Sequence, residues 1–177
     1  MDNYKITEDE LLVMRAKTGT PLDVYKLWQK YEEWIDRLVK TSIGNEIEAE
    51  MEVIEIQDKF TKSIKYFKGR SSFKTYLYRI VKNIIKSYYR KQKALEKTIS
   101  PEQEENIRDS LNDGLDLARI EKVRKVLARI KPDLSEVLNL RFLQGFTIKE
   151  AAELLAKSES SIKRLTDLAI VQFRNVY

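Results

Sequence analysis

The residues best suited to chemistry lie between Phe67 and Lys91, where aromatic and basic side chains alternate. Unpaired bases stack on aromatic rings, each contact contributing about 1 to 3 kcal/mol, while lysine and arginine hold the phosphates. Asn83 adds an amide that can donate to a base edge and accept from it. The segment therefore predicts a surface for single-stranded nucleic acid. The candidate contact residues are Gly69, Arg70, Ser71, Ser72, Lys74, Tyr76, Arg79, Lys82, Asn83, Lys86 and Arg90.

The same segment can also be interpreted as an amphipathic helix with core aromatics and solvated lysines. For Phe73, Leu77 and Ile80, which recur at helical spacing, we favour packing. For Asn83 and the loop of residues 69–72 we favour binding. The rings expected to offer stacking faces are those of Tyr76, Tyr78, Tyr88 and Tyr89.

Charge is distributed unevenly along the chain, although the net value is only +5. From Lys68 to Lys97, ten basic residues stand against one acidic residue, a local charge of +9. From Thr98 to Asp116, six acidic residues stand against one arginine, a local charge of −5. Clustered lysine and arginine release counterions when they bind a polyanion. We therefore expect the basic segment to bind nucleic acid, and the acidic one has the composition of a linker.

The sequence contains no cysteine and no histidine. A disulfide framework and a thiolate metal site are therefore excluded, and the commonest metal ligand and general base is missing. We expect no cofactor, no metal and no enzymatic activity. No apolar run approaches the roughly 18 residues of a membrane span, and the N-terminus lacks the apolar core of a signal peptide. We expect a cytoplasmic protein with no membrane partner.

Capping signals and helical spacing predict an all-helical protein, because 5 Gly and 3 Pro provide little turn chemistry for a sheet. Thr7 and Thr20 start the first two helices, which end near Gly19 and Ser42. A third helix is expected at about residues 46–67, and Ser72 caps a fourth. In the third helix we expect an inward face and a separate acidic face. The inward residues are Ile47, Met51, Ile54, Phe60 and Ile64, and the acids are Glu48, Glu52 and Glu55.

A second helical unit is expected from about Leu115. Its first helix ends at Lys131-Pro132, and its second spans about residues 134–143. Thr147 and Glu150 then form a capping box for a short helix, and Ser158 caps the last one. Two short helices around a tight turn are what a helix-turn-helix requires. We therefore expect two helical domains, residues 1–97 and 117–177, joined by a flexible acidic linker at 98–116.

In a helix-turn-helix, the first residues of the second helix face the major groove of DNA. Lysine and arginine at these positions can reach guanine or phosphate. The alternative is an ordinary solvated helix start. The candidate contact residues are Glu159, Ser160, Ser161, Lys163 and Arg164.

The basic aromatic segment closely resembles the promoter-melting and minus-10-reading segment of sigma-70 family factors, especially the small extracytoplasmic-function group. The family pattern is an aromatic, a loop with glycine, Phe-x-x-Trp/Tyr-Leu, Arg-Ile-x-x-Asn and a basic run. The matching residues are Phe67, Gly69, Phe73, Tyr76, Leu77, Arg79, Ile80, Asn83 and Arg90. The resemblance implies a sigma factor that binds bacterial core RNA polymerase and promoter DNA, with residues 69–72 capturing a flipped base.

Residues 127–173 resemble the minus-35-reading domain of the same family. The matches include Leu140-Arg-Phe142, Thr147, Glu150-Ala-Ala152 and Ile162-Lys163. Ala156-Lys157 replaces the usual turn glycine, and the usual Arg-Leu pair is shifted to residues 164–165. The resemblance implies that this unit reads double-stranded DNA.

The third helix resembles the family surface that binds a coiled coil of the largest polymerase subunit. The chain keeps Gln57-Asp58-Lys-Phe60 of that pattern but has Ile54 in place of an acid. A solvated acidic face is the alternative interpretation. The candidate core-polymerase contacts are Glu48, Glu52, Glu55, Gln57 and Asp58. The sequence leaves open whether an anti-sigma factor, a further partner class of this family, binds the chain.

Two rival functions stay open from the sequence. One is a phage-type transcriptional activator that uses only the C-terminal helix-turn-helix. The other is a helical adaptor whose basic helix binds RNA or an acidic protein. Binding to core polymerase distinguishes a sigma factor from both.

Overall fold

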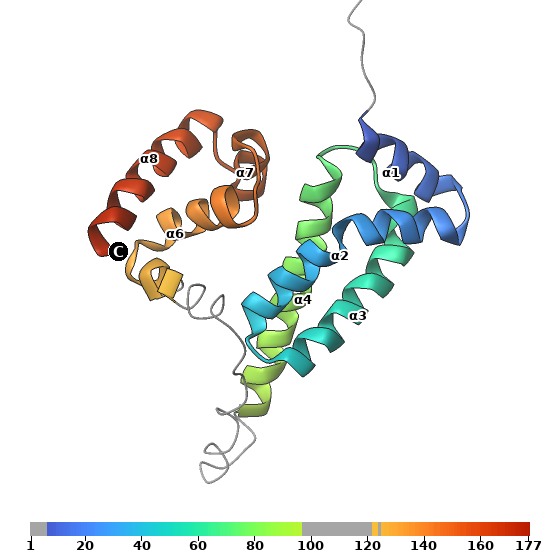
Figure 1. Ribbon diagram of the computed structural model, residues 1–177, viewed down its shortest axis with the longest axis horizontal. Helices are drawn as coiled ribbons and strands as arrows, with labels where there is room; N and C mark the ends of the chain where they lie inside the picture. Colours follow the sequence, from blue (N-terminus) through green and yellow to red (C-terminus); the bar gives the residue numbers. More distant parts are fainter. Residues whose placement is uncertain (1–6, 97–121, 124) are drawn as a thin grey trace, which may run out of the picture. The chain divides into compact units, whose positions relative to one another are not determined.

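The computed structural model describes residues 7–96, 122–123 and 125–177 (Figure 1). Every element in these ranges is helical, and contacts divide the chain into two compact units, residues 1–111 and 112–177. None of the helices in these ranges is long and apolar enough to cross a membrane. The expected linker at 98–116 and the expected start of the second unit near residue 115 lie outside the described residues.

The first two helices begin at the threonines that the sequence indicated. In α1 (Glu8–Thr18), the Glu10 amide donates to the Thr7 hydroxyl at 3.2 Å, and the Thr7 amide donates to the Glu10 carboxylate at 2.8 Å. In α2 (Pro21–Ile43), the Thr20 amide donates to Asp23 at 3.2 Å. These bonds satisfy amides that have no partner inside a helix.

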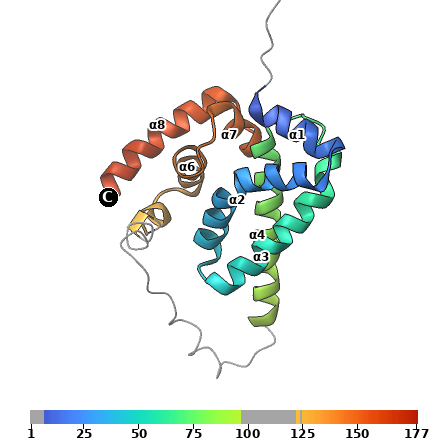
Figure 2. The same cartoon turned by 45° about the vertical axis from the view of Figure 1, so that its right-hand side comes forward.

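The next helices complete the first unit. α3 (Glu46–Ser63) is capped by Asn45 and continues into the short 3-10 helix η1 (Ile64–Tyr66). α4 (Phe73–Glu96) begins after Ser72, whose hydroxyl accepts from the Thr75 amide at 3.2 Å. α2, α3 and α4 lie side by side in both ribbon views (Figures 1 and 2).

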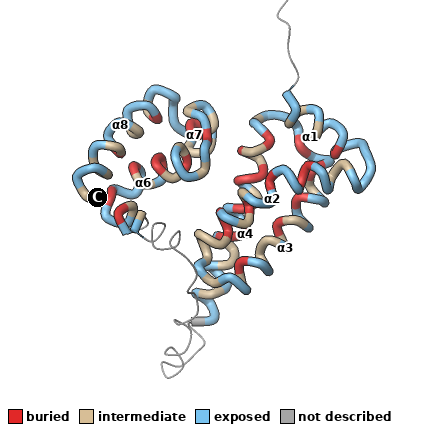
Figure 3. The backbone as a smooth tube through the Cα atoms, in the orientation of Figure 1, coloured by how far each residue is buried: buried red, intermediate tan, exposed pale blue. Residues whose placement is uncertain are grey.

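An aromatic cluster forms the centre of this unit. The ring centroid of Phe73 lies 6.0 Å from that of Phe60 and 5.5 Å from that of Phe67. The ring centroid of Trp28 lies 5.6 Å from that of Phe60. Phe73 is 5% exposed and Leu77 1%, which confirms their predicted role in packing. Buried positions lie on each of α2, α3 and α4 (Figure 3).

The prediction for the inward face of α3 was wrong at three positions. Ile47, Met51 and Ile54 are 74%, 66% and 67% exposed. Phe60 and Ile64 are buried as predicted, together with Ala49 and Ile56. The step from Ile54 to Phe60 turns the helix by about 240°, so these two residues cannot share a face. The buried set instead follows helical spacing, and Ile47, Met51 and Ile54 form an exposed apolar row on the outer side of α3.

The second unit contains α6 (Pro132–Leu138), the π-helical turn η3 (Asn139–Leu143), α7 (Ile148–Leu155) and α8 (Glu159–Val176). α6 starts two residues earlier than the predicted Leu134, because Pro132 occupies its first position. The core of this unit combines residues from α6, α8 and the segment before α6. The buried members of this cluster are Val126, Ile130, Leu134, Leu138 and Ala169, and the unit also buries Val137, Leu140, Phe146, Ala151, Ala152 and Ile162.

A short helix, α7, and a longer one, α8, are joined by a tight turn in the second unit. Thr147 and Glu150 form the predicted capping box at the start of α7. Ala156 then adopts left-handed backbone angles, with φ at +51°, and the Ser158 hydroxyl caps α8 by accepting from the Ser161 amide. Buried Ala151 and Ala152 present little bulk on α7, in agreement with the predicted helix-turn-helix.

Candidate nucleic-acid interface

The outer face of α4 carries a row of exposed polar side chains. Leu77, Val81 and Ile84 are buried in the first unit, and this packing fixes which side of the helix meets solvent. The opposite side presents the predicted candidates at steps of three and four residues. These exposed candidates are Arg79, Lys82, Asn83, Lys86 and Arg90.

The loop before α4 has one position, residue 69, where the backbone conformation favours glycine. Gly69 has φ at +68°, a region that other residues rarely adopt, and a β carbon there would meet nothing within 4 Å. Arg70 is exposed beside it. Ser71 donates to the Ser72 carbonyl at 3.3 Å, and the Ser72 hydroxyl donates to Thr75 at 3.0 Å. Ser72 therefore has a capping role in addition to its place in the candidate loop.

Two further candidates are packed into the first unit. The Lys74 ammonium lies 5.3 Å from the centroid of the Trp34 ring. The Tyr76 hydroxyl donates to the Ser63 carbonyl at 3.2 Å, and its ring centroid lies 4.9 Å from that of Phe67. Lys74 and Tyr76 thus contribute to the packing of the first unit, and their role in binding stays a prediction.

The other tyrosines of α4 also make contacts inside the unit. Tyr78 is 4% exposed, so the prediction that it offers a stacking face was wrong. The Tyr88 hydroxyl donates to Glu48, and the Tyr89 hydroxyl donates to the Ser42 carbonyl. Burial is the larger cause, and the bond to Glu48 the next, of a rise in the pKa of Tyr88 to about 12. These rings fix α4 against α2 and α3.

A hollow of about 450 Å³ opens between the end of α3, η1 and α4. Asn83 forms part of its wall, beside the apolar side chains of Ile80 and Ile84. Apolar side chains suit the face of a base, and an amide suits its edge. The hollow therefore places Asn83 where it can meet an unstacked base. The remaining lining residues are Lys59, Lys62, Ser63 and Tyr66.

Sequence reasoning missed these four residues because they precede the basic aromatic segment. Lys59 pairs with Glu55 and Lys62 with Asp58, each at 2.7 Å between the ammonium and the carboxylate. Exposed pairs of this kind contribute only about 0 to 1 kcal/mol, so a phosphate can replace the carboxylate at low cost. The available signal was the recurrence of lysine at every third position, Lys59, Lys62 and Lys65, directly before Tyr66.

The second unit presents the start of α8 to solvent. Glu159, Ser160, Lys163 and Arg164 are exposed, whereas Ser161 is half-buried. Ile162 is completely buried and holds this end of the helix in the unit. The cationic side chains predicted to reach DNA thus point away from the core. In the described ranges, no group of three or more acidic residues could hold a metal ion.

Two family models match the chain. The model described as Sigma-70 region 2 matches residues 27–95, and the model described as Sigma-70, region 4 matches residues 120–170. The first range contains the hollow and all of α4 except its last residue, and the second contains α7 and the first two thirds of α8. Together they cover more than half of the sequence. The chain belongs to the sigma-70 family.

Two curated relatives place the chain with the extracytoplasmic-function (ECF) group of sigma-70 factors. The ECF RNA polymerase sigma factor BldN of Streptomyces coelicolor is 29% identical over 168 residues, covering 90% of this chain and 62% of BldN. The ECF RNA polymerase sigma factor SigX of Bacillus subtilis is 29% identical over 145 residues, covering 77% of this chain and 74% of SigX. The chain thus spans less than two thirds of the length of BldN.

Two solved structures resemble the chain in fold. CnrH in complex with the cytosolic domain of CnrY has a TM-score of 0.69 and 17% identity, covering 94% of this chain and 95% of that chain. The sigma factor RpoE in complex with the anti-sigma factor NepR, from Bartonella quintana, has a TM-score of 0.62 and 20% identity, covering 87% and 96%. These likenesses support the helical fold.

Within the sigma-70 region 2 match, the acids of α3 turn toward α4. Glu48 accepts from Tyr88 and, at 3.5 Å, from Gln92. Burial, together with the nearby charge of Glu55, raises the pKa of Glu52. Glu55 pairs with Lys59 and lies 3.9 Å from Lys91. Of the remaining predicted core-polymerase contacts, Gln57 is half-buried and Asp58 is exposed.

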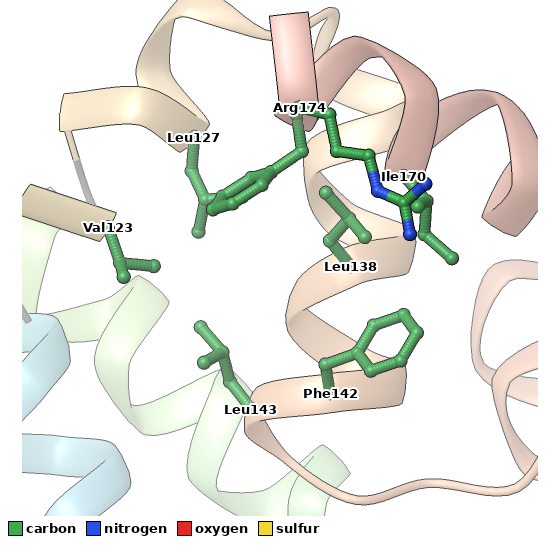
Figure 4. Close-up of a pocket in the computed structure, with 8 residues that line it drawn as sticks. Val123, Leu127, Leu138, Phe142, Leu143, Ile170 and Arg174 are labelled. Carbon is green, nitrogen blue, oxygen red and sulfur yellow. The ribbon is translucent and has the colours of Figure 1, made fainter. Parts of the chain in front are cut away.

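In the second unit, an apolar groove of about 510 Å³ opens beside α8 (Figure 4). Phe142 and Leu143 are 58% and 53% exposed, and Arg174 is the one charged residue of the lining. Large exposed apolar side chains that cluster in a groove mark an interaction surface. The other lining residues are Val123, Leu127, Leu138, Ile170 and Phe173.

Proposed function

We propose that this chain is a sigma factor that binds bacterial core RNA polymerase and directs promoter-specific initiation of transcription. The observation that carries the proposal is the hollow beside Asn83 on the cationic face of α4, inside the residues that match sigma-70 region 2. The polymerase supplies the chemistry, and this chain supplies specificity. It is therefore not an enzyme itself, needs no cofactor, and acts in the cytoplasm with the polymerase.

In the first step, the C-terminal unit, residues 117–177, reads the minus-35 element as duplex DNA. The start of α8 enters the major groove, where Lys163 and Arg164 reach guanine or phosphate. Glu159, Ser160 and Ser161 form the first turn of the helix, before Lys163 and Arg164, and complete the contact. Phosphate contacts set the register of the helix, and base contacts select the sequence.

In the second step, the N-terminal unit, residues 1–97, holds the opened minus-10 strand. The phosphates follow the cations of the outer face of α4, and the loop with Gly69 and Arg70 meets the strand where it leaves the duplex. A base then enters the hollow and presents its edge to Asn83. The cations assigned to the phosphates are Arg79, Lys82, Lys86 and Arg90.

We assign core-polymerase binding in the first unit to the outer side of α3. Gln57 and Asp58 belong to this surface, together with the exposed apolar row of Ile47, Met51 and Ile54. Glu48, Glu52 and Glu55 stay candidate contacts of the same helix, although Glu48 accepts from Tyr88 and Glu55 pairs with Lys59. The groove beside α8 is the corresponding surface of the second unit.

The rival functions account for less of the molecule. A plain helix-turn-helix activator uses the second unit alone and leaves the region 2 match, the hollow and the cationic face of α4 without a role. A helical adaptor leaves the helix-turn-helix without a role. We also propose an anti-sigma factor as a regulatory partner, because the structural relative RpoE was solved with one.

Gel filtration with bacterial core polymerase tests the proposal against both rivals. A sigma factor is expected to elute with core enzyme and to bind duplex promoter DNA weakly when alone. A chain that elutes apart from core enzyme, or that binds duplex DNA tightly by itself, contradicts the proposal. Substituting Ile54→Ser should weaken the complex with core, whereas Leu22→Ser should not; Leu22 is an exposed apolar residue on α2 and serves as the control.

A further inference from the structure

Tyr66 is an exposed aromatic ring at the edge of the hollow. Its side chain is 68% exposed, although burying a tyrosine ring normally stabilises a fold. It lies in η1 and shares the lining with Asn83, Lys59 and Lys62. Packing gives no reason for a large ring to stand in solvent at this position.

The neighbours of Tyr66 hold its backbone in place. Ile64 and Phe67, on either side, are 2% and 8% exposed, and the Phe67 amide donates to the Ile64 carbonyl at 3.0 Å. The ring therefore projects from a segment that is anchored at both ends. A preorganised aromatic side chain loses little conformational freedom when a partner stacks on it.

The charge around Tyr66 suits a nucleotide. The Lys65 ammonium lies over the ring, 5.0 Å from its centroid, and two more lysines line the hollow. A ring has two faces, so a base can stack on one while the lysines hold its phosphate. An exposed ring among cations, beside an amide, suits a single-stranded nucleic acid, because every nucleotide offers a planar base to the ring and a phosphate to the lysines.

We propose that Tyr66 is a stacking platform for an unpaired base next to the one that Asn83 contacts. This inference rests on the proposed function and names a further residue of its minus-10 site. Stacking tolerates any base, because every base has a π face. Tyr66 therefore adds affinity for the opened strand, while Asn83 adds the preference for sequence.

The test measures binding of the full chain to a fluorescein-labelled pool of random single-stranded 12-mers by fluorescence anisotropy. Tyr66→Leu removes the ring and should weaken binding by roughly 5- to 150-fold. Tyr66→Phe keeps the ring and should restore most of the affinity. A 12-mer of abasic residues should bind wild type and Tyr66→Leu equally, because it has phosphates but no bases. Tyr25→Leu, a half-exposed tyrosine outside the hollow, is the matched control.

Three outcomes would overturn the proposal: no loss of affinity in Tyr66→Leu, an equal loss in Tyr66→Phe, or an equal loss with the abasic 12-mer. Failure of the wild-type chain to bind the random pool would overturn it as well. Circular dichroism of each variant separates these outcomes from misfolding. Transcription by the wild-type chain with core polymerase is scored separately, so failure of the stacking role is distinguished from failure of the proposed function.

Discussion

Asn83 is the residue on which the account of base recognition depends. It is exposed on α4 and lines the hollow, so replacing it with alanine removes an amide without disturbing the core. Asn83→Ala should change the ratio of transcription between promoters that differ at the contacted minus-10 base by roughly 5- to 150-fold. Binding to core polymerase should be unchanged. Competitive transcription from a library of minus-10 sequences measures this change. Equal loss on every promoter would instead indicate a structural role for Asn83.

Lys86 is the cation best placed to report on phosphate contacts, because it is exposed in the middle of the outer face of α4. Each phosphate neutralised by a cation releases condensed counterions, which makes binding depend on salt. Lys86→Ala should reduce the salt slope of open-complex formation by about one. Lys26→Ala, exposed on α2, is the control and should leave the slope unchanged. An unchanged slope in Lys86→Ala would exclude this contact.

Asp9 connects α1 to α2 and should make the stability of the first unit depend on pH. Burial favours a higher pKa for Asp9, but hydrogen bonds from Lys30 and Tyr31 outweigh it and hold the pKa below 3.8. A carboxylate whose pKa is lower in the folded than in the unfolded chain stabilises the fold at a pH above its unfolded pKa. This contribution is lost as the pH falls through its folded pKa.

Asp9→Asn should therefore lower the free energy of unfolding at pH 7 by about 0.2 to 1 kcal/mol, with a smaller difference at pH 3. Urea denaturation followed by tryptophan fluorescence measures this unit alone, because both tryptophans, Trp28 and Trp34, lie in α2. The same difference at both pH values would contradict the proposed electrostatic origin.

At the scale of elements, the turn of the helix-turn-helix carries a measurable strain. Ala156 has φ at +51°, where the β carbon of any residue except glycine meets the backbone, at a cost of about 1 to 2 kcal/mol. Ala156→Gly should stabilise α7 and α8 by about 1 kcal/mol, and Glu153→Gly, inside α7, should destabilise them by a similar amount. Amide hydrogen exchange of the two helices measures both effects. Lower protection in Ala156→Gly would contradict this assignment.

The helices themselves were largely predictable because their starts are local. Thr7, Thr147 and Ser158 bond to amides within three residues, so the sequence alone carries the signal. The inward face of α3 was less predictable, because this helix has apolar residues on two sides and only packing against its neighbours selects one. The π-helical end after α6 has no comparable sequence signal.

The candidate site was predictable in part for the same reason. Arg79, Asn83 and Lys86 follow from the spacing of one amphipathic helix. Tyr66 and Lys62 come from another element, and they meet α4 only in the folded unit. The burial of Tyr78 likewise depends on contacts with other elements, such as the Trp34 ring at 6.3 Å. A pattern within one helix could not show which tyrosines the core uses.

At the scale of the whole molecule, two units with different binding surfaces share one chain. The first presents a cationic helix and a hollow, and the second presents a helix-turn-helix and an apolar groove. The match to region 2 and region 4 of the sigma-70 family assigns each unit to its own part of that family's architecture. In the proposed function, both units bind the polymerase and each one reads its own promoter element.

Run-off transcription with bacterial core polymerase tests this account most directly. Core enzyme with the full chain should give discrete transcripts from genomic promoter fragments that core enzyme alone does not transcribe. Arg164→Ala should reduce these transcripts from promoters with a minus-35 element, and Asn83→Ala should redistribute them among minus-10 sequences. If core enzyme with the wild-type chain gives the same products as core enzyme alone, the chain does not act as a sigma factor.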